Sequence, residues 1–393
     1  MDIDLSIKPP DGSPFAEHER IRAHGPIFWS DSLHGWVVHS YDDVKKVMTD
    51  SANFSNENTP ISRTFGAEAM LVNDSPMHRN IRNVWAKPAS VVGVAAITGD
   101  IERIADSLIG PLAARLNAGD AVNLVNVFQE FMSEMITSLM DIPSEHKFDL
   151  VRWNRIISDA AVLVLEESDP RFKERDDAKE GVYALLRAAV ADRRERLGRG
   201  EAPQDLVSLM VAAEGHNGIT QSIALDNLLN LLLGALDTTV RWMGNILVVL
   251  RRHPQALAAV LADRSLLPQA LEEVMRVESV VQLTLRIVRN DGIELGGQLL
   301  KAGDFVYAMP GAANRDPLVF ERPGEFDIFR KPKLHLGFGF GMHQCLGMSI
   351  ARKEALVFFN QLFDRVPSLA IAECDYGAAW TLWGPNKLVV LSQ

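Results

Sequence analysis

The chain has 393 residues, of which 47% are hydrophobic, so it can bury the core of a large globular protein. Its formal net charge of −11 at pH 7 argues against a nucleic-acid-binding protein, because such domains are normally basic. No stretch of about 18 uninterrupted apolar residues occurs, so we expect no membrane span. The acidic start of the chain lacks the apolar segment of a signal peptide, and we therefore expect a cytoplasmic protein.

The sequence shows no repeat, linker-like segment or abrupt change of composition, which predicts a single domain over residues 1–393. Its two cysteines are Cys345 and Cys374. The absence of CxxC and CxxCH patterns argues against a zinc ribbon, a thioredoxin-like centre and a covalently attached haem. A disulfide between the two cysteines stays open, although nothing else is typical of a secreted disulfide-rich protein.

The N-terminal part predicts a helix over residues 14–23, strands over 27–30 and 36–39, and a second helix that begins at Ser40. Ser40 is a candidate N-cap, and acidic residues follow it in the first turn, where negative charge suits the helix dipole. Residues 52–76 are rich in Ser, Asn, Thr and Pro, so we expect a long loop. Loops of this length in compact domains are often lids over functional sites.

From Pro76 to about Val280 the chain has helical periodicity. Beyond that point we predict, in order, β-rich residues 283–310 with a hairpin turn at Gly296-Gly297, irregular residues 311–344, a long helix from Leu346 to about Phe363, and a strand at Leu388–Leu391. This order lacks the βαβ alternation of a doubly wound fold. The predicted fold class is mainly α with small β-sheets (α+β).

One predicted helix is unusually long and carries polar residues in its middle. It runs from a candidate N-cap at Thr220 to Pro254, and its middle turns are apolar on most sides, which indicates a helix through the core. Residues 234–239, Gly-Ala-Leu-Asp-Thr-Thr, place an acid and two hydroxyl groups in these apolar turns. Burying such polar groups lowers the stability of the protein, so we expect them to have a function. Such a threonine either bonds back to the preceding turn or opens the helix for a ligand or water.

The most specific pattern surrounds Cys345. Residues 338–347 read Phe-Gly-Phe-Gly-Met-His-Gln-Cys-Leu-Gly, at the start of the last predicted helix. The glycines allow a tight turn and close approach to a flat partner, while loop amides and the helix N-terminus favour the thiolate. A lone cysteine beside a glycine turn is usually a small buried hydrophobe. The whole pattern, however, resembles the haem-thiolate loop of the cytochrome P450 family.

The resemblance implies a cytochrome P450 fold, with haem b buried between the long central helix and the helix after Cys345. It implies that the Cys345 thiolate is the axial ligand of the iron and that Phe338 and Gly339 contact the cofactor. The haem propionates would be bound by four residues at family positions: His78, Arg82, Arg286 and His343. His335 also lies near the loop in sequence, but the pattern assigns it no role.

Residues 234–239 resemble the oxygen-activation segment of the family. By this match Thr238 would steady a water molecule near O2, and Asp237 would supply protons to a site that must exclude bulk water. Ala235 stands where the family usually has glycine, and its methyl group would narrow the groove for O2.

An ExxR pattern places Glu273 and Arg276 on one helix face, where they can pair. Glu17 and Arg20 have the same spacing, so the pattern alone says little. Its place between the central helix and the Cys345 loop matches the family, and the resemblance adds Arg330 as a third member. This network would support folding and cofactor retention rather than chemistry.

The resemblance also implies a substrate-binding wall of mainly apolar residues, which favours a small hydrophobic substrate. Its predicted members are Phe65, Leu71, Val72, Leu232, Ala235, Val281, Thr284 and Leu382. The sequence carries no flavin-binding or iron–sulfur motif, so electrons should come from a ferredoxin or flavodoxin with its reductase. Such a partner would dock on basic residues that include Arg79, Lys87, Arg352 and Lys353.

The predicted function is that of a monomeric haem-thiolate monooxygenase, which uses O2 and two electrons to hydroxylate or O-dealkylate its substrate. A peroxide-driven or isomerase-type haem-thiolate enzyme is the alternative, although such enzymes often lack the acid–alcohol pair. A non-catalytic haem-binding sensor is a further alternative from another class, although the chain shows no fused output domain.

Overall fold

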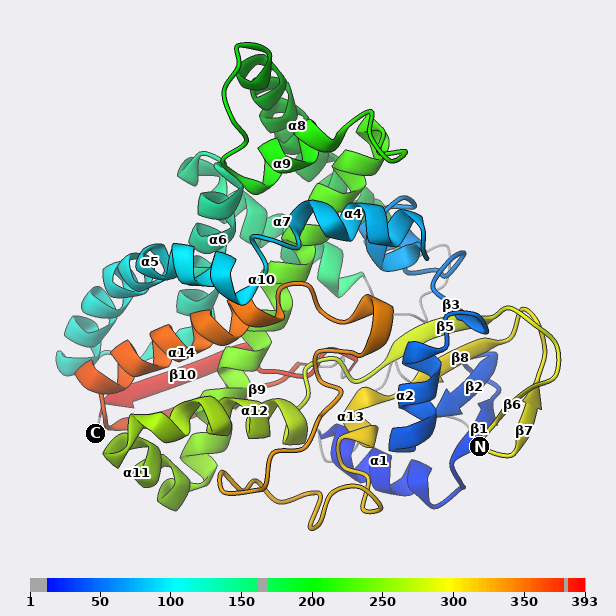
Figure 1. Cartoon of the computed structure of the whole chain (residues 1–393). Coiled ribbons are helices and arrows are strands. Elements are labelled where there is room, and N and C mark those ends of the chain that lie inside the picture. The colour runs from blue at the N-terminus through cyan, green and yellow to red at the C-terminus, as the bar shows by residue number, and fades with distance from the viewer. Residues whose placement is uncertain (1–12, 161–168, 378–380, 393) are drawn as a thin grey trace. The chain divides into compact units, whose positions relative to one another are not determined.

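The computed structural model describes residues 13–160, 169–377 and 381–392 (Figure 1). The chain divides into two compact units, each built from separate stretches of sequence. The first unit comprises residues 1–55, 97–128 and 238–393, and the second comprises residues 56–96 and 129–237. Helices α5 (Val91–Asn117), α6 (Leu124–Met140) and α10 (Gln221–Arg252) contribute residues to both units. The single domain expected from the sequence stays a prediction.

The first unit contains a five-stranded sheet with the order β1-β2-β8-β5-β3. Its strands are β1 (Ile27–Ser30), β2 (Gly35–Val38), β3 (Phe54–Ser55), β5 (Thr284–Val288) and β8 (Phe305–Ala308). All neighbouring strands are antiparallel except β2 and β8, which are parallel. Helix α2 (Tyr41–Thr49) shares a buried apolar cluster with this sheet. Ser40 caps α2 as predicted, because its hydroxyl oxygen accepts from the backbone N–H of Asp43 at 3.3 Å.

Two smaller sheets complete the strands of this unit. β6 (Ile293–Leu295) and β7 (Gln298–Leu300) form the hairpin predicted at Gly296-Gly297, and both glycines have positive φ, 55° and 82°. The predicted C-terminal strand is confirmed as β10 (Lys387–Ser392), which pairs with β9 (Leu369–Asp375) and β4 (Val122–Asn123). The sequence predicted neither β9 nor β4, and β4 interrupts the stretch from Pro76 to Val280 that was expected to be helical.

The remaining elements of the first unit are α1 (Pro14–Arg22), α11 (Pro254–Ala262), α12 (Leu267–Val277), α13 (Pro310–Ala313) and α14 (Met348–Arg365). The first predicted helix is confirmed within one residue by α1, and the last predicted helix within two residues at each end by α14. Between α13 and α14 the chain forms one short 3-10 turn at Gly341–His343 and is otherwise irregular, as predicted.

The second unit is helical. Besides its parts of the shared helices, it contains α3 (Ser62–Phe65), α4 (Met77–Trp85), α7 (Lys147–Asp159), α8 (Pro170–Gly198) and α9 (Leu206–Ala213). The loop predicted over residues 52–76 includes β3, α3 and a 3-10 turn at Met70–Val72. The rest of the segment is irregular, as predicted, and buried Thr64, Ala69 and Val72 pack it into the protein.

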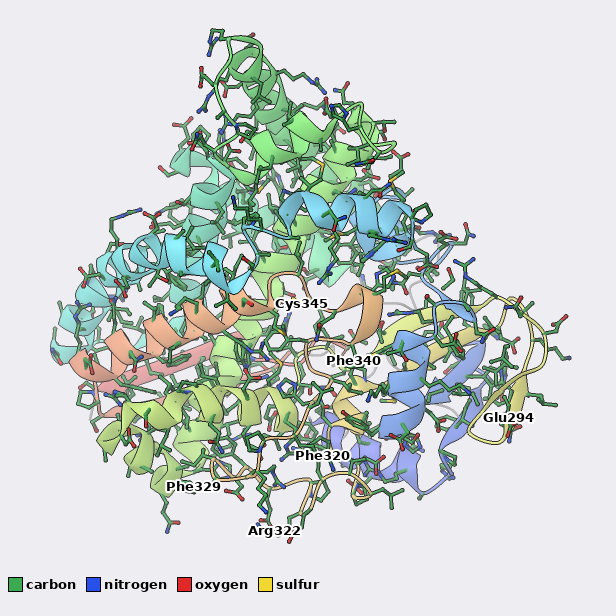
Figure 2. All side chains as sticks on the ribbon, in the orientation of Figure 1. Glu294, Phe320, Arg322, Phe329, Phe340 and Cys345 are labelled. Atoms are coloured by element: carbon green, nitrogen blue, oxygen red, sulfur yellow. The ribbon has the colours of Figure 1, made fainter. Side chains whose placement is uncertain are left out.

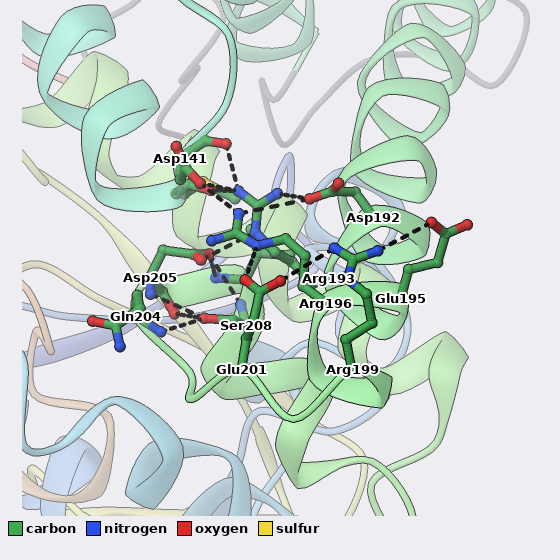
Figure 3. A network of polar contacts seen from close by, with 12 residues as sticks. Asp141, Asp192, Arg193, Glu195, Arg196, Arg199, Glu201, Gln204, Asp205 and Ser208 are labelled. Atoms are coloured by element: carbon green, nitrogen blue, oxygen red, sulfur yellow. Dashed lines mark hydrogen bonds and ion pairs between the residues drawn. The ribbon is translucent and has the colours of Figure 1, made fainter.

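A buried arginine joins three segments of the second unit (Figure 3). Arg193 on α8 donates to the carboxylate of Asp205 at 3.0 Å and to that of Asp141 at 2.8 Å. Asp205 also caps α9, because its Oδ1 accepts from the backbone N–H of Val207 and of Ser208 at 2.9 and 3.0 Å. Arg193 therefore connects the C-terminal ends of α6 and α8 with the start of α9.

Helix α10 has 32 residues and begins after the predicted cap, because the Thr220 hydroxyl oxygen accepts from the N–H of Ile223 at 3.2 Å. It ends at Arg252, and α11 starts at Pro254. The most apolar window of α10 has a mean hydropathy of 1.3, which is enough for a membrane span by length and composition. Within the protein, however, 67% of that window is buried, as in the core helix of a globular protein.

Candidate functional site

The loop before α14 folds back on itself and presents Cys345; Figure 2 shows it together with Phe340. The backbone N–H of Cys345 donates to the carbonyl oxygen of Phe338 at 2.8 Å, which closes the glycine-rich segment. Cys345 is exposed and is not joined to Cys374 by a disulfide, which resolves the pairing that the sequence left open. Helix α14 begins three residues later, and the positive end of its dipole favours the thiolate.

Two glycines allow this loop to sit tightly against its neighbours in the first unit. A Cβ atom on Gly337 would lie 2.6 Å from the side chain of Met275 on α12. Gly341 has a φ of +73°, and a Cβ atom there would lie 2.6 Å from the carbonyl oxygen of Met48 on α2. Both positions therefore require glycine, which explains part of the motif in structural terms.

Phe338 connects the loop to a cluster of charged groups. Its ring makes an edge contact with Trp242 on α10, with ring centroids 5.5 Å apart, and the Arg352 guanidinium lies 4.7 Å from its centroid. Arg352 donates twice to Glu272, at 2.7 and 2.6 Å. The His335 ring nitrogen lies 3.2 Å from the same carboxylate. His335, which had no assigned role, thus belongs to a cluster that supports the loop.

Glu272 in this cluster is ionised over the whole physiological range. Its burial opposes ionisation, but the hydrogen bonds from His335 and Arg352 outweigh that effect and lower its pKa to about 2. A permanently negative Glu272 keeps Arg352 in place over the Phe338 ring.

The structure brings Glu273, Arg276 and Arg330 together in the first unit. Arg276 donates to both oxygens of Glu273, at 2.8 and 2.7 Å, and Arg330 donates to the same carboxylate at 2.9 Å. Arg276 is only 2% exposed and also donates to the carbonyl oxygens of Asn314, Pro323 and Glu325. The network therefore pins α12 to the irregular segment between α13 and the Cys345 loop.

The Gly234–Thr239 segment of α10 is less buried than the sequence predicted. Gly234 is exposed, and Ala235, Asp237 and Thr238 are half-buried, whereas Leu232, Leu233, Leu236 and Thr239 are buried. The acid and Thr238 thus lie along the part of α10 where small residues leave the helix uncovered.

The residues predicted to bind the propionates are distributed over the two units. In the first unit, His343 lies in the Cys345 loop, and Arg286 lies on β5, where it is 5% exposed and donates to the Thr284 hydroxyl at 2.9 Å. In the second unit, His78 and Arg82 occupy one face of α4, and His78 is buried. Gly339, predicted to contact the cofactor, has a φ of +68° in the Cys345 loop.

The predicted substrate residues form two groups. In the first unit, Val281 and Leu382 face each other across an antiparallel bridge, close in sequence to Thr284. In the second unit, Phe65 ends α3, Leu71 and Val72 lie in the following 3-10 turn, and Leu232 and Ala235 lie on α10. Leu232 is fully buried and belongs to the core. A small hollow of about 240 Å³ beside Val72 is mostly polar, lined also by Glu57, Asn58, Ser62, Ala67 and Asn73.

Sequence reasoning missed the polar residues that hold these two groups in place. In the first unit, the Trp383 indole N–H donates to the buried carboxylate of Glu278 at 2.5 Å, next to Leu382. In the second unit, Asp226 and Asn227 of α10 bind the backbone of residues 68–70. An Asp-Asn pair at the edge of an apolar helical run is the signal that could have indicated the second contact.

The side chains around Cys345 suit a metal ion whose other ligands are supplied by a macrocycle. Across the described ranges, no group of three or more His, Cys, Asp or Glu side chains could hold a metal ion by itself. A single exposed thiolate needs a metal whose other ligands come from elsewhere, as in haem. Half-buried Phe338, Phe340 and Leu346 beside Cys345 offer an apolar surface for a flat ring. The residues present therefore fit the haem that the sequence implied.

Comparison with known proteins leads to the same family. Residues 18–263 and 258–366 match the cytochrome P450 family. The chain is 30% identical over 376 residues to the vitamin D3 dihydroxylase of Streptomyces griseolus, covering 92% of this chain and 88% of that protein. It is 29% identical over 386 residues to the cytochrome P450 monooxygenase PikC of Streptomyces venezuelae, covering 96% and 88%.

A solved structure with the same fold is that of P450BioI in complex with an acyl carrier protein ligated to hexadec-9Z-enoic acid. It has a TM-score of 0.88 and 25% sequence identity, over 97% of this chain and 98% of that one. The predicted resemblance and the mainly α fold class are thus confirmed. The predicted enzyme class, a monooxygenase, is confirmed as well.

Proposed function

The chain belongs to the cytochrome P450 family, and on that premise we propose that it is a haem b-dependent monooxygenase that hydroxylates or O-dealkylates a small hydrophobic molecule. One observation carries the proposal: Cys345 is exposed in a closed glycine-rich loop directly before a helix N-terminus. Bound haem would supply the reductive activation of O2, in which one oxygen atom enters the substrate and the other becomes water with two electrons and two protons.

Cys345 would be the thiolate ligand, with Phe338 and Gly339 beside it in the loop. His78, Arg82, Arg286 and His343 would bind the two propionates, as the family resemblance implies. A guanidinium as buried as that of Arg286 is well suited to a carboxylate partner. The apolar side chains beside Cys345 would exclude water from the thiolate and keep it a strong donor.

Asp237 and Thr238 would transfer protons to O2 from the part of α10 that small residues leave uncovered. The Thr238 hydroxyl would hold a water molecule, and the Asp237 carboxylate would exchange protons with solvent and pass them inward. The Ala235 methyl group lies in the same stretch and would limit the space for O2.

The substrate would be small and hydrophobic, bound by the predicted wall residues Phe65, Leu71, Val72, Leu232, Ala235, Val281, Thr284 and Leu382. P450BioI was solved in complex with an acyl carrier protein. The mainly apolar wall predicted for this chain favours a free small molecule instead.

Electrons would come from a ferredoxin or flavodoxin and its NAD(P)H-dependent reductase. Arg79 and Lys87 are exposed and suit an acidic partner. Arg352, also predicted for this surface, already pairs with Glu272 and contributes less free charge. We propose further that the protein works as a monomer in the cytoplasm.

The decisive test is the absorption spectrum of the reduced protein under carbon monoxide. The wild type should show the long-wavelength Soret band of a thiolate-ligated haem, and Cys345→Ser should lose it. Cys374→Ser is the matched control, because Cys374 lies on β9 and should leave the spectrum unchanged. A wild type without this band after supplementation with hemin would refute the proposal.

A second measurement separates the monooxygenase from a peroxide-driven enzyme. The proposal predicts substrate-dependent NADH consumption with a ferredoxin system, and it predicts that Thr238→Ala releases peroxide in place of product. Turnover with hydrogen peroxide alone, without any contribution from the ferredoxin system, would favour the alternative. Unchanged coupling in Thr238→Ala would contradict the proton role.

A further inference from the structure

The segment that carries Phe65, Leu71 and Val72 is held by two neighbouring residues of α10, eleven and ten positions before Asp237. We propose that Asp226 and Tyr183 form a releasable latch on this segment, with Asn227 as its fixed anchor, and that the latch controls how substrate enters and leaves. The proposal rests on the proposed function, because it takes these three side chains to be substrate contacts. All of its members lie in the second unit.

Asn227 is the anchor because it is fully buried and makes three hydrogen bonds. Its Oδ1 accepts from the backbone N–H of Met70 at 2.7 Å, and its Nδ2 donates to the carbonyl oxygens of Glu68 at 2.9 Å and Ile223 at 2.7 Å. The side chain thus hydrogen-bonds to the backbone of residues 68–70 both as donor and as acceptor, as a neighbouring strand would. Separating these groups would leave buried polar atoms unsatisfied, which is costly.

Asp226 forms the latch through a carboxylate that water can reach. Its Oδ2 accepts from the backbone N–H of Glu68 at 2.9 Å, and its Oδ1 accepts from the Tyr183 hydroxyl at 2.6 Å. Asp226 and Tyr183 are both half-buried. Water can therefore replace these bonds when the segment moves, so the latch opens at a lower cost than the anchor.

Gly66 shows that this contact is built into the segment. Its φ is +95°, and a Cβ atom there would lie only 2.4 Å from Cγ of Asp226. Only glycine permits both this backbone conformation and the close approach of the Asp226 carboxylate. The residue directly before it is Phe65, so the latch acts beside a proposed substrate contact.

Tyr183 remains a donor to Asp226 at physiological pH. Burial, and then the hydrogen bond to Asp226, raise the pKa of Tyr183. A second contact from the same helix reaches the start of the segment, where Lys179 donates to the carbonyl oxygen of Arg63 at 2.7 Å. Helices α8 and α10 thus both hold residues 62–70.

The positions of these bonds give them a role in access. Phe65 and Gly66 precede the anchored residues, so Phe65 moves when the latch opens, whereas Leu71 and Val72 follow the anchored Met70 and stay in place. Asp226, Tyr183 and Asn227 are positioning residues, because they act on the substrate wall through the backbone of another segment.

Hydrogen exchange on the full-length protein tests the latch directly. In Asp226→Ala we expect the amides of residues 66–68 to exchange about tenfold to a hundredfold faster than in the wild type, because the hydrogen bond of Glu68 to a charged group is lost, whereas the Met70 amide, held by Asn227, should not change. Tyr183→Phe, which removes one hydroxyl, should accelerate the same amides by roughly two- to tenfold. The control is Asp177→Ala: Asp177 is an exposed acid on α8 that pairs with Lys173, and its loss should change nothing in this segment.

Rapid mixing of the haem-loaded protein with 4-phenylimidazole tests access. Both the binding and the dissociation rate of this probe should rise in Asp226→Ala and Tyr183→Phe and stay unchanged in Asp177→Ala. Unchanged exchange in both latch variants would overturn the latch, and faster exchange with unchanged probe rates would overturn its control of access. A wild type that binds no haem would refute the proposed function and the access role with it, whereas the exchange result would still decide whether the latch exists.

Discussion

Replacing Arg276 with alanine should destabilise the protein far more than a surface substitution does. Arg276 is 2% exposed, and its guanidinium donates to the Glu273 carboxylate and to three backbone carbonyl oxygens. The variant would leave Glu273 buried, with Arg330 and the N–H of Asp327 as its remaining hydrogen-bond donors. Breaking a buried ion pair costs about 3–5 kcal/mol, and each orphaned carbonyl adds about 1 kcal/mol. Since folded domains have only about 5–15 kcal/mol of stability, most of it would be lost.

The chain offers a matched control for this experiment. Glu17 and Arg20 have the same spacing on α1, but the Arg20 side chain is 49% exposed, so Arg20→Ala should cost less than about 1 kcal/mol. Urea unfolding followed by tryptophan fluorescence gives the free energy of unfolding of each variant. Arg276→Lys, which keeps the charge but not the planar fork, should fall between them and remains measurable if the alanine variant does not fold. Free energies for Arg276→Ala and Arg20→Ala within 1 kcal/mol of each other would refute the reasoning.

Three further predictions follow from buried or strained groups. Burial raises the pKa of Glu354 from 4.5 to about 8, so the folded chain holds a proton that the unfolded chain releases, and stability should fall as the pH rises from about 4.5 to about 8. In urea titrations, the free energy of unfolding of the wild type should fall by up to about 5 kcal/mol over this pH range, and Glu354→Gln should remove that fall. Equal pH profiles for the two proteins would contradict this prediction. Arg193→Ala should cost about 3–5 kcal/mol in the same assay, because Asp205 stays buried, and a loss below 1 kcal/mol would count against that. Gly341→Ala should lower the haem-to-protein ratio, because φ is +73° and a Cβ would strike a backbone oxygen of α2, whereas Gly110→Ala on α5, with open space around it, should not; equal ratios would argue against a strained loop.

The Cys345 loop illustrates how far a linear pattern can lead. Its glycines, its cysteine and the helix that follows are neighbours in the chain, so their geometry depends on local backbone preferences that the residue types already carry. The hairpin at Gly296-Gly297 and the cap at Ser40 were predicted for the same reason, and the structure confirms both.

Apart from Arg330, which the family resemblance placed beside Glu273, the groups that meet across long distances in sequence were not predicted. His335 and Arg352 converge on Glu272 from 63 and 80 residues away, and periodicity carries no information about such encounters. The segment 52–76 was predicted to be a long loop from its composition, but its close packing was not predicted. It is packed because Asn227, more than 150 residues further on, satisfies its backbone groups.

Residue order alone thus predicted the family and the mainly α architecture, both of which are confirmed, and it supplied the proposal that Cys345 binds iron, since each depends on contiguous motifs and short-range conformational preference. Folding in three dimensions settled which polar groups are buried, which charges neutralise each other and which side of α10 stays uncovered. These depend on long-range contacts, where desolvation makes a buried charge or amide acceptable only beside a partner that the chain brings from far away.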